Sequence, residues 1–389
     1  MLLRSMGALW EALLPLGVFA RGTLSPYLFL LCVKGLSSLI KAFVANGDLK
    51  GISVCRGGLE LSHLFFADDS LIFCRVSMED CDELQRVLGV YERVSGQQLN
   101  RAKTSLFFSK NTLREIQGAI QSRFGAQVIK QHEKYLGLPS LIGKNKRNTF
   151  NDIKETFGKK LAGWKEKLLS KASKEILIKV VALVITTYTM SCFKIPESLC
   201  DDLTSMIRNF WWGQKSEERK IPWVSWEKMC EPKVGGGLGF KNSKCFNLTL
   251  LAKQGWRLQL AQDSLVFWVS KAKYFPSCDF IHASLGHNPS YTWRSIMATQ
   301  DLVKGGVMWR VGNGRDVRVW GDRWLPCSSS YGVISPRLVL HEDTRVGELI
   351  DIEVKCWKSS VVDFIFLPYE AEAVKSIPLS VRLPPDKLV

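Results

Sequence analysis

Two adjacent carboxylates, Asp68 and Asp69, are the residues whose type and spacing point most directly to chemistry. They stand between two short apolar runs, residues 63–66 and residues 71–74. An apolar run, two turn-forming residues and a second apolar run predict a tight β-hairpin with an anionic tip. Carboxylates on a rigid hairpin can hold divalent metal against a nucleoside triphosphate, as nucleotide polymerisation requires. The simpler alternative is a solvated turn, because Asp is a favoured turn residue.

The segment before the pair predicts a helix followed by strands. Ser25-Pro26 is typical of a helix start, with a capping hydroxyl and Pro at the first helical position. Residues 27–46 are apolar nearly all round, so we expect this helix to be buried, and Gly47 to end it. Residues 51–74 predict short strands, the last two of which form the hairpin that carries the carboxylates.

The segment after the pair predicts a second helix with one apolar face. Ser77 and Asp80 are spaced as a capping pair, and Gly96 follows as a helix stop. Four apolar residues recur at helical spacing in between: Leu84, Val87, Leu88 and Tyr91. Residues 105–109 then predict a short strand. The order helix, strands, helix, strand predicts an α+β fold with helices on one face of a small sheet.

The charge of the chain favours a polyanionic partner. The chain carries a formal charge of +16. Its 389 residues are enough for two or three domains, and its 46% hydrophobic content is typical of a folded protein. Residues 101–180 hold 18 Lys and Arg against 6 Asp and Glu, which is +12 of that total. A basic segment next to a metal-binding hairpin suggests that a phosphate backbone lies across both. Charge alone is equally consistent with a solvated basic helix face.

The eleven cysteines indicate neither a zinc site nor a disulfide framework. Their number is odd, and no two have the spacing of a zinc-binding pair. This usage favours a reducing, intracellular compartment, the cytoplasm or the nucleus. Residues 8–20 resemble the apolar part of a signal peptide, but Glu11 interrupts them, so no secretion signal is expected. Charged residues also interrupt the aliphatic segment 176–195, which predicts a buried helix and no membrane partner.

Beyond the expected sheet the chain changes in character. Residues 111–131 predict a polar helix, residues 135–139 a loop, and the residues from there to about 210 a basic helical region. A glycine cluster at 235–239 lacks the preceding strand of a dinucleotide-binding motif, so we expect a loop there. From residue 210 onward Trp is frequent, and we expect a domain boundary near 215–240.

Several motifs follow one another in order. Phe66-Ala67-Asp68-Asp69 is preceded by Leu24-Ser25-Pro26-Tyr27-Leu28-Phe29 and followed by residues 95–105, which include Lys103. Further motifs come later: Tyr135-Leu136-Gly137-Leu138-Pro139 and the Trp- or Gly-rich segments 210–213, 236–240, 256–257 and 319–326. From about residue 21 to the C-terminus this series resembles the middle portion of a plant-type non-LTR (LINE-like) retrotransposon reverse transcriptase.

The resemblance implies an RNA-directed DNA polymerase that takes an RNA template and a DNA primer. It implies a partial palm, formed by a small antiparallel sheet with helices, then a helical thumb and a Trp-rich mixed C-terminal region. Asp68 and Asp69 would be the catalytic ligands of Mg²⁺ or Mn²⁺. The residues implied in nucleotide binding are Ser25, Pro26, Phe66 and Lys103. The residues implied in holding the template and primer backbone are Lys144, Lys146, Arg147, Lys159 and Lys160.

Two departures from the family indicate an incomplete catalytic site. Family members bring a further metal-binding Asp on an earlier strand, whereas the first 47 residues here contain no Asp and a single Glu, Glu11. The Gln-Gly-Asp-Pro stretch that shapes the nucleotide pocket is also missing before Leu24. We therefore expect a polymerase fragment that is inactive as an isolated chain. The alternatives are a non-catalytic nucleic-acid-binding remnant, or a poorly folding product with an exposed sheet edge beside the hairpin.

Four segments are expected on this basis. They are an unmatched N-terminal segment at 1–22, the partial palm at 23–140, the thumb-like region at 141–222 and a Trp-rich connector region at 223–389.

Overall fold

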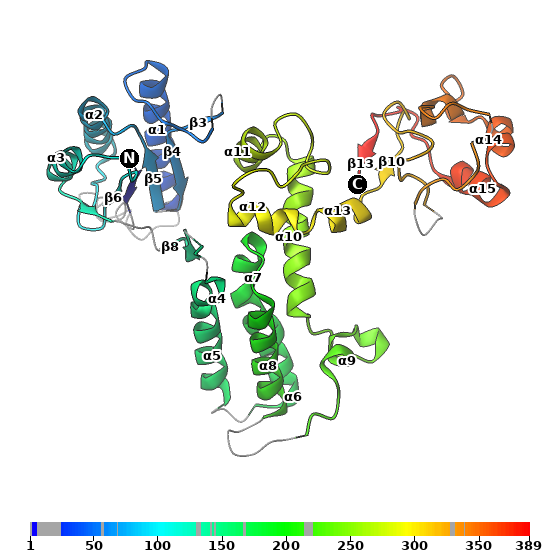
Figure 1. The fold of residues 1–389 in the computed structure, drawn as a ribbon, viewed down its shortest axis with the longest axis horizontal. Coiled ribbons are helices and arrows are strands. Elements are labelled where there is room, and N and C mark those ends of the chain that lie inside the picture. The colour runs from blue at the N-terminus through cyan, green and yellow to red at the C-terminus, as the bar shows by residue number, and fades with distance from the viewer. Residues whose placement is uncertain are drawn as a thin grey trace. The chain divides into compact units, whose positions relative to one another are not determined.

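The computed structural model describes residues 2–5, 25–55, 58–67, 69–129, 134–140, 142–143, 145–165, 169–213, 221–326, 331–337 and 339–389. The chain divides into two compact units, Met1–Met297 and Ala298–Val389 (Figure 1). Helices and small sheets occur in both units, which confirms the α+β class. The assignment of a palm, a thumb and a connector, with their boundaries, stays a prediction.

A five-stranded sheet in the first unit carries the expected hairpin. Its strands, in order across the sheet, are β4 (His63–Phe66), β5 (Asp69–Phe73), β1 (Leu2–Ser5), β6 (Ser105–Phe107) and β7 (Gln127–Val128). Neighbours are antiparallel except for β6 and β7, which are parallel. A separate ribbon pairs β2 (Ile52–Ser53) with β3 (Glu60–Leu61). The strands expected within 51–74 and at 105–109 are therefore confirmed.

The expectation of an exposed sheet edge beside the hairpin is corrected on the β5 side, where β1 pairs, whereas β4 is the edge strand of the sheet. β1 pairs along β5 from Leu2, opposite Phe73, to Ser5, opposite Ser70. Its other edge pairs with β6. β5 is therefore an inner strand that is paired on both sides, and its backbone N–H and C=O groups are not open to another chain.

Three helices pack with this sheet around one core: α1 (Ser25–Ala45), α2 (Met78–Ser95) and α3 (Arg114–Phe124). Ile40, Leu84 and Ile120, one from each helix, are fully buried in the same cluster as Ile72 and Leu106 of the sheet. α2 begins and ends as predicted, with the Ser77 hydroxyl accepting from the Asp80 N–H at 3.1 Å and Gly96 left-handed at φ +69°. Its four predicted core residues are all buried.

α1 is less buried than its composition predicts. Phe29, Leu36 and Ile40 form its buried stripe, whereas Tyr27 and Leu31 are 67% and 66% exposed. The expectation of a helix buried all round was therefore wrong. Because α1 contacts β4 on the sheet and α2 beside it, one side of the helix is covered and its first two turns keep apolar side chains at the surface.

Two helical stretches are long and apolar enough to cross a membrane when only length and composition are considered. They are Tyr27–Ala45 in α1 and Lys171–Cys192 further along, among the residues that the structure describes. Core helices of soluble proteins meet the same criterion, so this finding does not place the chain in a membrane.

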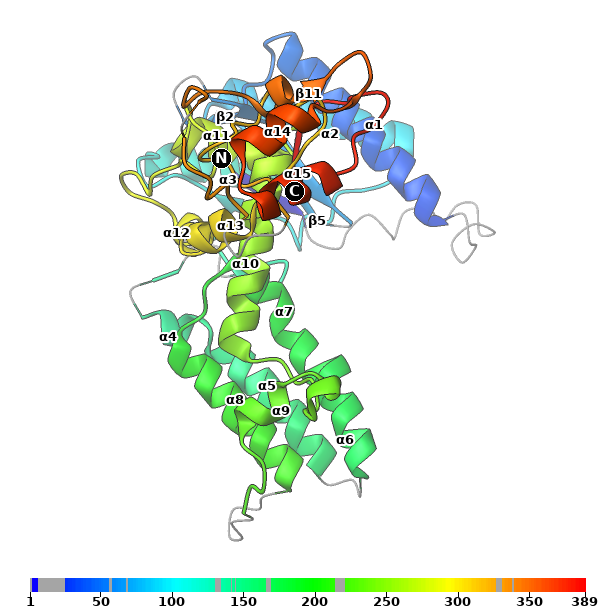
Figure 2. The same ribbon diagram turned by 90° about the vertical axis from the view of Figure 1, so that its right-hand side faces the viewer.

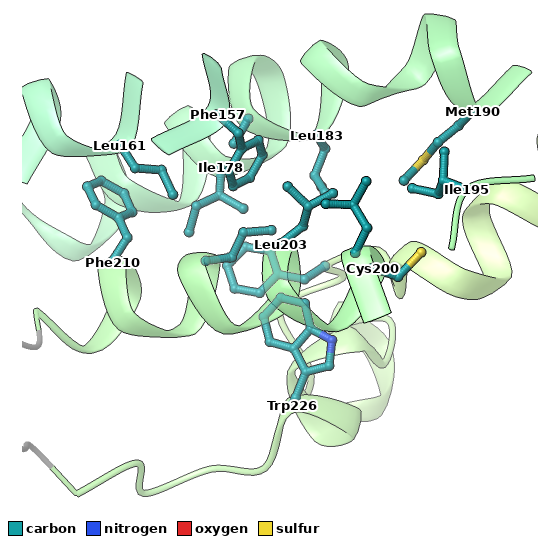
Figure 3. Close-up of a cluster of buried hydrophobic side chains, with 14 of the residues drawn as sticks. Phe157, Leu161, Ile178, Leu183, Met190, Ile195, Cys200, Leu203, Phe210 and Trp226 are labelled. Carbon is teal, nitrogen blue, oxygen red and sulfur yellow. The ribbon is translucent and has the colours of Figure 1, made fainter. Parts of the chain in front are cut away.

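The basic region predicted to be helical forms a group of packed helices: α4 (Lys146–Thr149), α5 (Asn151–Lys165), α6 (Lys171–Leu177), α7 (Leu183–Cys192) and α8 (Glu197–Trp212). A π-helical segment, Ile178–Ala182, joins α6 to α7. Figures 1 and 2 both show α5 beside α8. Their buried faces meet in one core, in which Leu161, Ile178 and Phe210 lie close together (Figure 3).

The chain then continues through α9 (Trp226–Cys230), a short 3₁₀ turn (Lys233–Gly235), α10 (Ser243–Leu260), α11 (Leu265–Tyr274) and α12 (Tyr291–Met297). Trp226 and Phe240 belong to the core of α5–α8. The glycine cluster is a loop apart from the 3₁₀ turn, largely as predicted.

Residues 135–139, expected to be a loop, instead form a tight hairpin. β8 (Lys134–Tyr135) pairs with β9 (Leu138–Pro139). The two residues between the strands are left-handed, Leu136 at φ +49° and Gly137 at φ +76°. Two residues with positive φ are what a type I′ hairpin loop requires, so Gly137 is the position where glycine is needed.

The second unit is built from short elements around a Trp-rich core. These are α13 (Gln300–Gly306), β10 (Trp309–Arg310) paired with β13 (Lys387–Leu388), a 3₁₀ turn (Val346–Leu349), β11 (Ile350–Asp351) paired with β12 (Cys356–Trp357), α14 (Ser359–Ile365) and α15 (Pro368–Ser376). Trp324 stacks on Trp357 within this core. The fully buried Glu370 carboxylate accepts hydrogen bonds from the N–H groups of Ile334 and Ser335, at 2.7 and 3.0 Å.

Candidate nucleic-acid interface

The hairpin predicted around the carboxylate pair is present. β4 and β5 pair with Phe66 opposite Asp69, so only two positions of the sequence separate the paired residues. Ala67 lies in the left-handed region at φ +49°, as the first residue of a two-residue hairpin loop does. Asp68, the first predicted metal ligand, lies outside the described residues. The hairpin is confirmed, and metal binding by the pair stays a prediction.

Asp69 is the only carboxylate on the described strands of this sheet. It is the half-buried first residue of β5, and the neighbouring β1, with the sequence Leu-Leu-Arg-Ser, contains no acidic residue. Within the described ranges, no three His, Cys, Asp or Glu side chains gather as a metal site requires. A two-metal centre needs several carboxylates that converge from different strands. The described residues therefore do not fit such a centre.

The register of the sheet brings Lys103 to the same end as Asp69. Arg4 of β1 lies opposite Leu71 on one side and Ser105 on the other. Asp69 and Lys103 each precede those partners by two residues. Lys103 lies in the turn before β6, and β1 lies between β5 and β6, so Lys103 and Asp69 are at the same end of the sheet but not on neighbouring strands. Lys103 is exposed, and its predicted role beside a triphosphate stays a prediction.

The other residues predicted to bind nucleotide are placed less completely. Ser25 and Pro26 are the first two residues of α1, and their side chains lie outside what the structure describes. Phe66 is the last residue of β4, directly opposite Asp69, and its side chain is 61% exposed. Of this set, the sheet register therefore brings Phe66 next to Asp69.

His63, which the sequence did not single out, links the hairpin to α1. Its Nε2 atom lies 2.7 Å from the Ser37 hydroxyl of α1, and its Nδ1 atom lies 2.9 Å from the hydroxyl of Ser62. Burial lowers the pKa of His63 below its usual 6.5, and the positive charge of Lys41 lowers it further. A neutral imidazole is therefore favoured at the base of the hairpin. In the sequence, His63 differs from its neighbours only as a polar residue at the start of an apolar strand.

The basic residues predicted to hold nucleic acid lie in different environments. Lys144 lies outside the described residues, and Lys159 and Lys160 are exposed on α5. Lys146 lies at the start of α4, with its Nζ atom 4.9 Å from the ring centroid of Tyr291. Arg147 instead lies 3.0 Å from the carboxylate of Asp202. Of the four described residues, Lys159 and Lys160 are exposed and form no ion pair within the described part of the chain.

Some basic side chains form ion pairs within the helical region, with Asp202 and with Glu175. Asp202 accepts hydrogen bonds from Lys154, at 2.8 Å, and from Arg147, which together lower the pKa of its carboxyl. Glu175 of α6 likewise lies 2.8 Å from Lys179 and 2.9 Å from Lys233, and these lysines lower its pKa. The spacing of Glu175 and Lys179 on one helix could have been found in the sequence. The partners that lie some fifty residues apart could not.

Comparison with known proteins gives three relatives from Arabidopsis thaliana. The uncharacterized mitochondrial protein AtMg00310 is 40% identical over 144 residues, which are 37% of this chain and 94% of that protein. The protein named "Putative ribonuclease H protein At1g65750" is 37% identical over 231 residues, 58% of this chain. The uncharacterized mitochondrial protein AtMg01250 is 47% identical over 47 residues, 12% of this chain.

The extent of these matches differs. The chain spans only 37% of At1g65750 and 38% of AtMg01250, but nearly all of AtMg00310. No family model matches the chain.

Proposed function

This chain belongs to the family of the uncharacterized mitochondrial protein AtMg00310 of Arabidopsis thaliana, and from that premise we propose that it is a retroelement-derived nucleic-acid-binding protein. More finely, we propose a fragment of a reverse transcriptase that holds an RNA template and a DNA primer but does not extend the primer. The proposal combines the polymerase ancestry indicated by the motifs with the sparse carboxylates of the sheet.

The β4–β5 hairpin is the observation that carries this proposal. It places Asp69 beside a two-residue loop at one end of a largely antiparallel sheet, with helices on one face. The same end of the sheet carries Lys103. A polymerase palm presents its carboxylates and a cation in an arrangement of this kind, and this agreement supports the ancestry.

The absence of polymerisation is proposed from the composition of the described strands. Phosphoryl transfer to a primer hydroxyl requires two metal ions to neutralise the developing charge. Asp69 is the one carboxylate on the described strands of this sheet, and its sequence neighbour Asp68 would add a second, while β1 contributes none. Carboxylates from one hairpin would contact the two metal ions from one side only, so the other side of the centre would have no protein ligand.

Nucleic-acid binding is proposed from charge and from one relative. The +16 formal charge gives the chain a long-range attraction to polyanions. The relative named as a ribonuclease H protein is named for an activity on nucleic acid, although this chain spans only 37% of it. Lys159 and Lys160, exposed on α5, are proposed contacts to the phosphate backbone.

A primer-extension assay tests the proposal. The full chain is incubated with an RNA template annealed to a DNA primer, all four deoxynucleoside triphosphates, and Mg²⁺ or Mn²⁺. We expect the duplex to be retained on a filter with the protein while the primer stays unextended. Extension that disappears in Asp68→Ala, but persists in the control Asp263→Ala, would show an active polymerase. A duplex that is neither retained nor extended would contradict both parts of the proposal.

A further inference from the structure

A pocket of about 380 Å³ lies in the first unit, walled by the start of α4, the segment between α7 and α8, and α12. Its volume is within the range of about 300–1,000 Å³ that is usual for small-molecule sites. Three cationic side chains line it: Lys146, Lys194 and Arg294. They come from positions spread over almost 150 residues of the chain, so no local sequence pattern could indicate the site.

The cations of this pocket are largely available to a ligand. Lys194 is half-buried and Arg294 is exposed, and neither forms an ion pair with a carboxylate in the described part of the chain. The one carboxylate in the lining, Glu197, has a side chain that is 73% exposed and lies 3.7 Å from Lys244. Three cations against one carboxylate, itself shared with Lys244, leave the pocket positive.

The start of α8 adds to this positive potential. α8 runs for 16 residues from Glu197, and the preceding Pro196 gives no side-chain cap to its first N–H groups. Pro196 and Glu197 both line the pocket. Uncapped N–H groups at a helix start carry partial positive charge and favour an anion such as phosphate.

Tyr291 holds one wall of the pocket in place, and its surroundings bear on whether the ligand is a phosphate or a nucleobase. Its hydroxyl donates a hydrogen bond to the carbonyl oxygen of Lys194, and its ring lies 6.1 Å from Phe193 and 6.4 Å from Phe150. Lys146 lies over the same ring. A nucleobase that stacked on this face of the ring would have to displace the Lys146 cation. The site therefore favours a phosphate over a base.

We propose that this pocket binds a phosphate group, held by Lys194 and Arg294 with Lys146 and the start of α8. Arg and Lys donate charge-assisted hydrogen bonds to phosphate oxygens, with Arg able to donate two in parallel. The phosphate belongs either to the backbone of a nucleic acid, a source that rests on the proposed function, or to a free nucleotide. Both sources share the same recognition chemistry.

Pyrophosphate titration of the full chain tests the pocket by itself. Calorimetry compares the wild type with the double variant Lys194→Ala/Arg294→Ala. The matched control is Lys253→Ala/Arg257→Ala, which removes one Lys and one Arg from the exposed surface of α10. We expect binding by the wild type and the control, and at least a tenfold loss of affinity in the pocket variant. Equal affinity in both double variants, or no binding by the wild type, would overturn the proposal.

A labelled single-stranded RNA distinguishes the source of the phosphate. If the source is a backbone, the pocket variant binds RNA more weakly than the control, and its plot of log affinity against log salt is shallower by about 1.4, the value for two lost contacts. If the source is a free nucleotide, AMP binding is lost in the pocket variant while RNA affinity matches the control. Loss of neither ligand in the pocket variant overturns the site. Pyrophosphate binding with no RNA binding by the wild type would keep the site and contradict the proposed function.

Discussion

Phe66 and Asp69 face each other across the β4–β5 hairpin, so only two residues connect the strands. The first of them, Ala67, has φ +49°. A side chain with a Cβ is costly in that region, whereas glycine adopts it without strain. Asp69 therefore lies close to a residue, Ala67, whose backbone conformation is unfavourable for a side chain with a Cβ.

Replacing Ala67 with glycine should stabilise the protein. We expect Ala67→Gly to raise the free energy of unfolding by about 0.5–1 kcal/mol, because relief of the left-handed strain outweighs the added freedom of the unfolded chain. Urea unfolding followed by circular dichroism measures this change. The control Ala119→Gly, on the exposed face of α3, should lower the free energy by about 0.5–1 kcal/mol. A loss of stability in both variants would contradict the turn geometry.

His63 should make stability depend on pH near neutrality. Because its pKa is lower in the folded protein than in the unfolded chain, the unfolded chain takes up the proton first as the pH falls. The contribution of His63 is therefore complete above pH 6.5 and is lost as the pH falls below that value. Urea unfolding at pH 7.5, 6.5 and 5.5 should show a steeper loss for the wild type than for His63→Gln.

The exposed His287 supplies the control for this measurement. His287→Gln should follow the wild-type pH dependence. Parallel curves for the wild type and His63→Gln would mean that His63 is not held neutral by its burial against α1.

Asn247 should be essential to the helical region. This buried side chain accepts from the Ile195 N–H at 3.0 Å and donates to the carbonyl oxygens of Met190 and Phe193, at 2.7 and 2.9 Å. Asn247→Leu leaves three backbone groups without a partner, so we expect a loss of about 2–4 kcal/mol in unfolding free energy. Trp fluorescence in urea follows the loss. The exposed Asn209→Ala on α8 should change it by less than about 0.5 kcal/mol, and an equal effect of the two variants would contradict the network.

Truncation to alanine at two positions on α1 should lower the free energy of unfolding by very different amounts. Ile40 is fully buried and Leu31 is 66% exposed, although both belong to one apolar helix. Ile40→Ala should cost about 2–5 kcal/mol through lost packing and a residual cavity, whereas Leu31→Ala should cost less than about 0.5 kcal/mol. Thermal unfolding of the two variants gives the comparison. A large loss in Leu31→Ala would mean that this face is covered in the folded protein.

The sequence was sufficient to predict those elements whose periodicity and start and stop signals lie within the element itself. α2 is the clearest case, since Ser77, Gly96 and the stripe at helical spacing were all placed correctly. The β4–β5 hairpin followed from two apolar runs and a two-residue turn. In both elements the local preference agrees with the tertiary structure.

Where the outcome depends on distant partners, the sequence was not sufficient. β1 has four residues, too few for a period, and becomes a strand by pairing with β5 and β6. The composition of α1 predicts burial, but nothing in it tells which neighbours exist to cover it. The pairing of Arg147 of α4 and Lys154 of α5 with Asp202 also depends on how these helices pack against α8. Counting charges along the chain therefore overstated how many remain available to nucleic acid.

The salt dependence of nucleic-acid binding tests the central claim most directly. Fluorescence anisotropy of a labelled RNA–DNA hybrid would be measured with the wild type between 50 and 200 mM salt. If several lysines and arginines contact the phosphate backbone, log affinity falls linearly with log salt, with a slope steeper than about −3. Lys159→Ala/Lys160→Ala should make the slope shallower, and Lys253→Ala/Arg257→Ala should not. Weak binding at 50 mM that does not change with added salt would contradict the account.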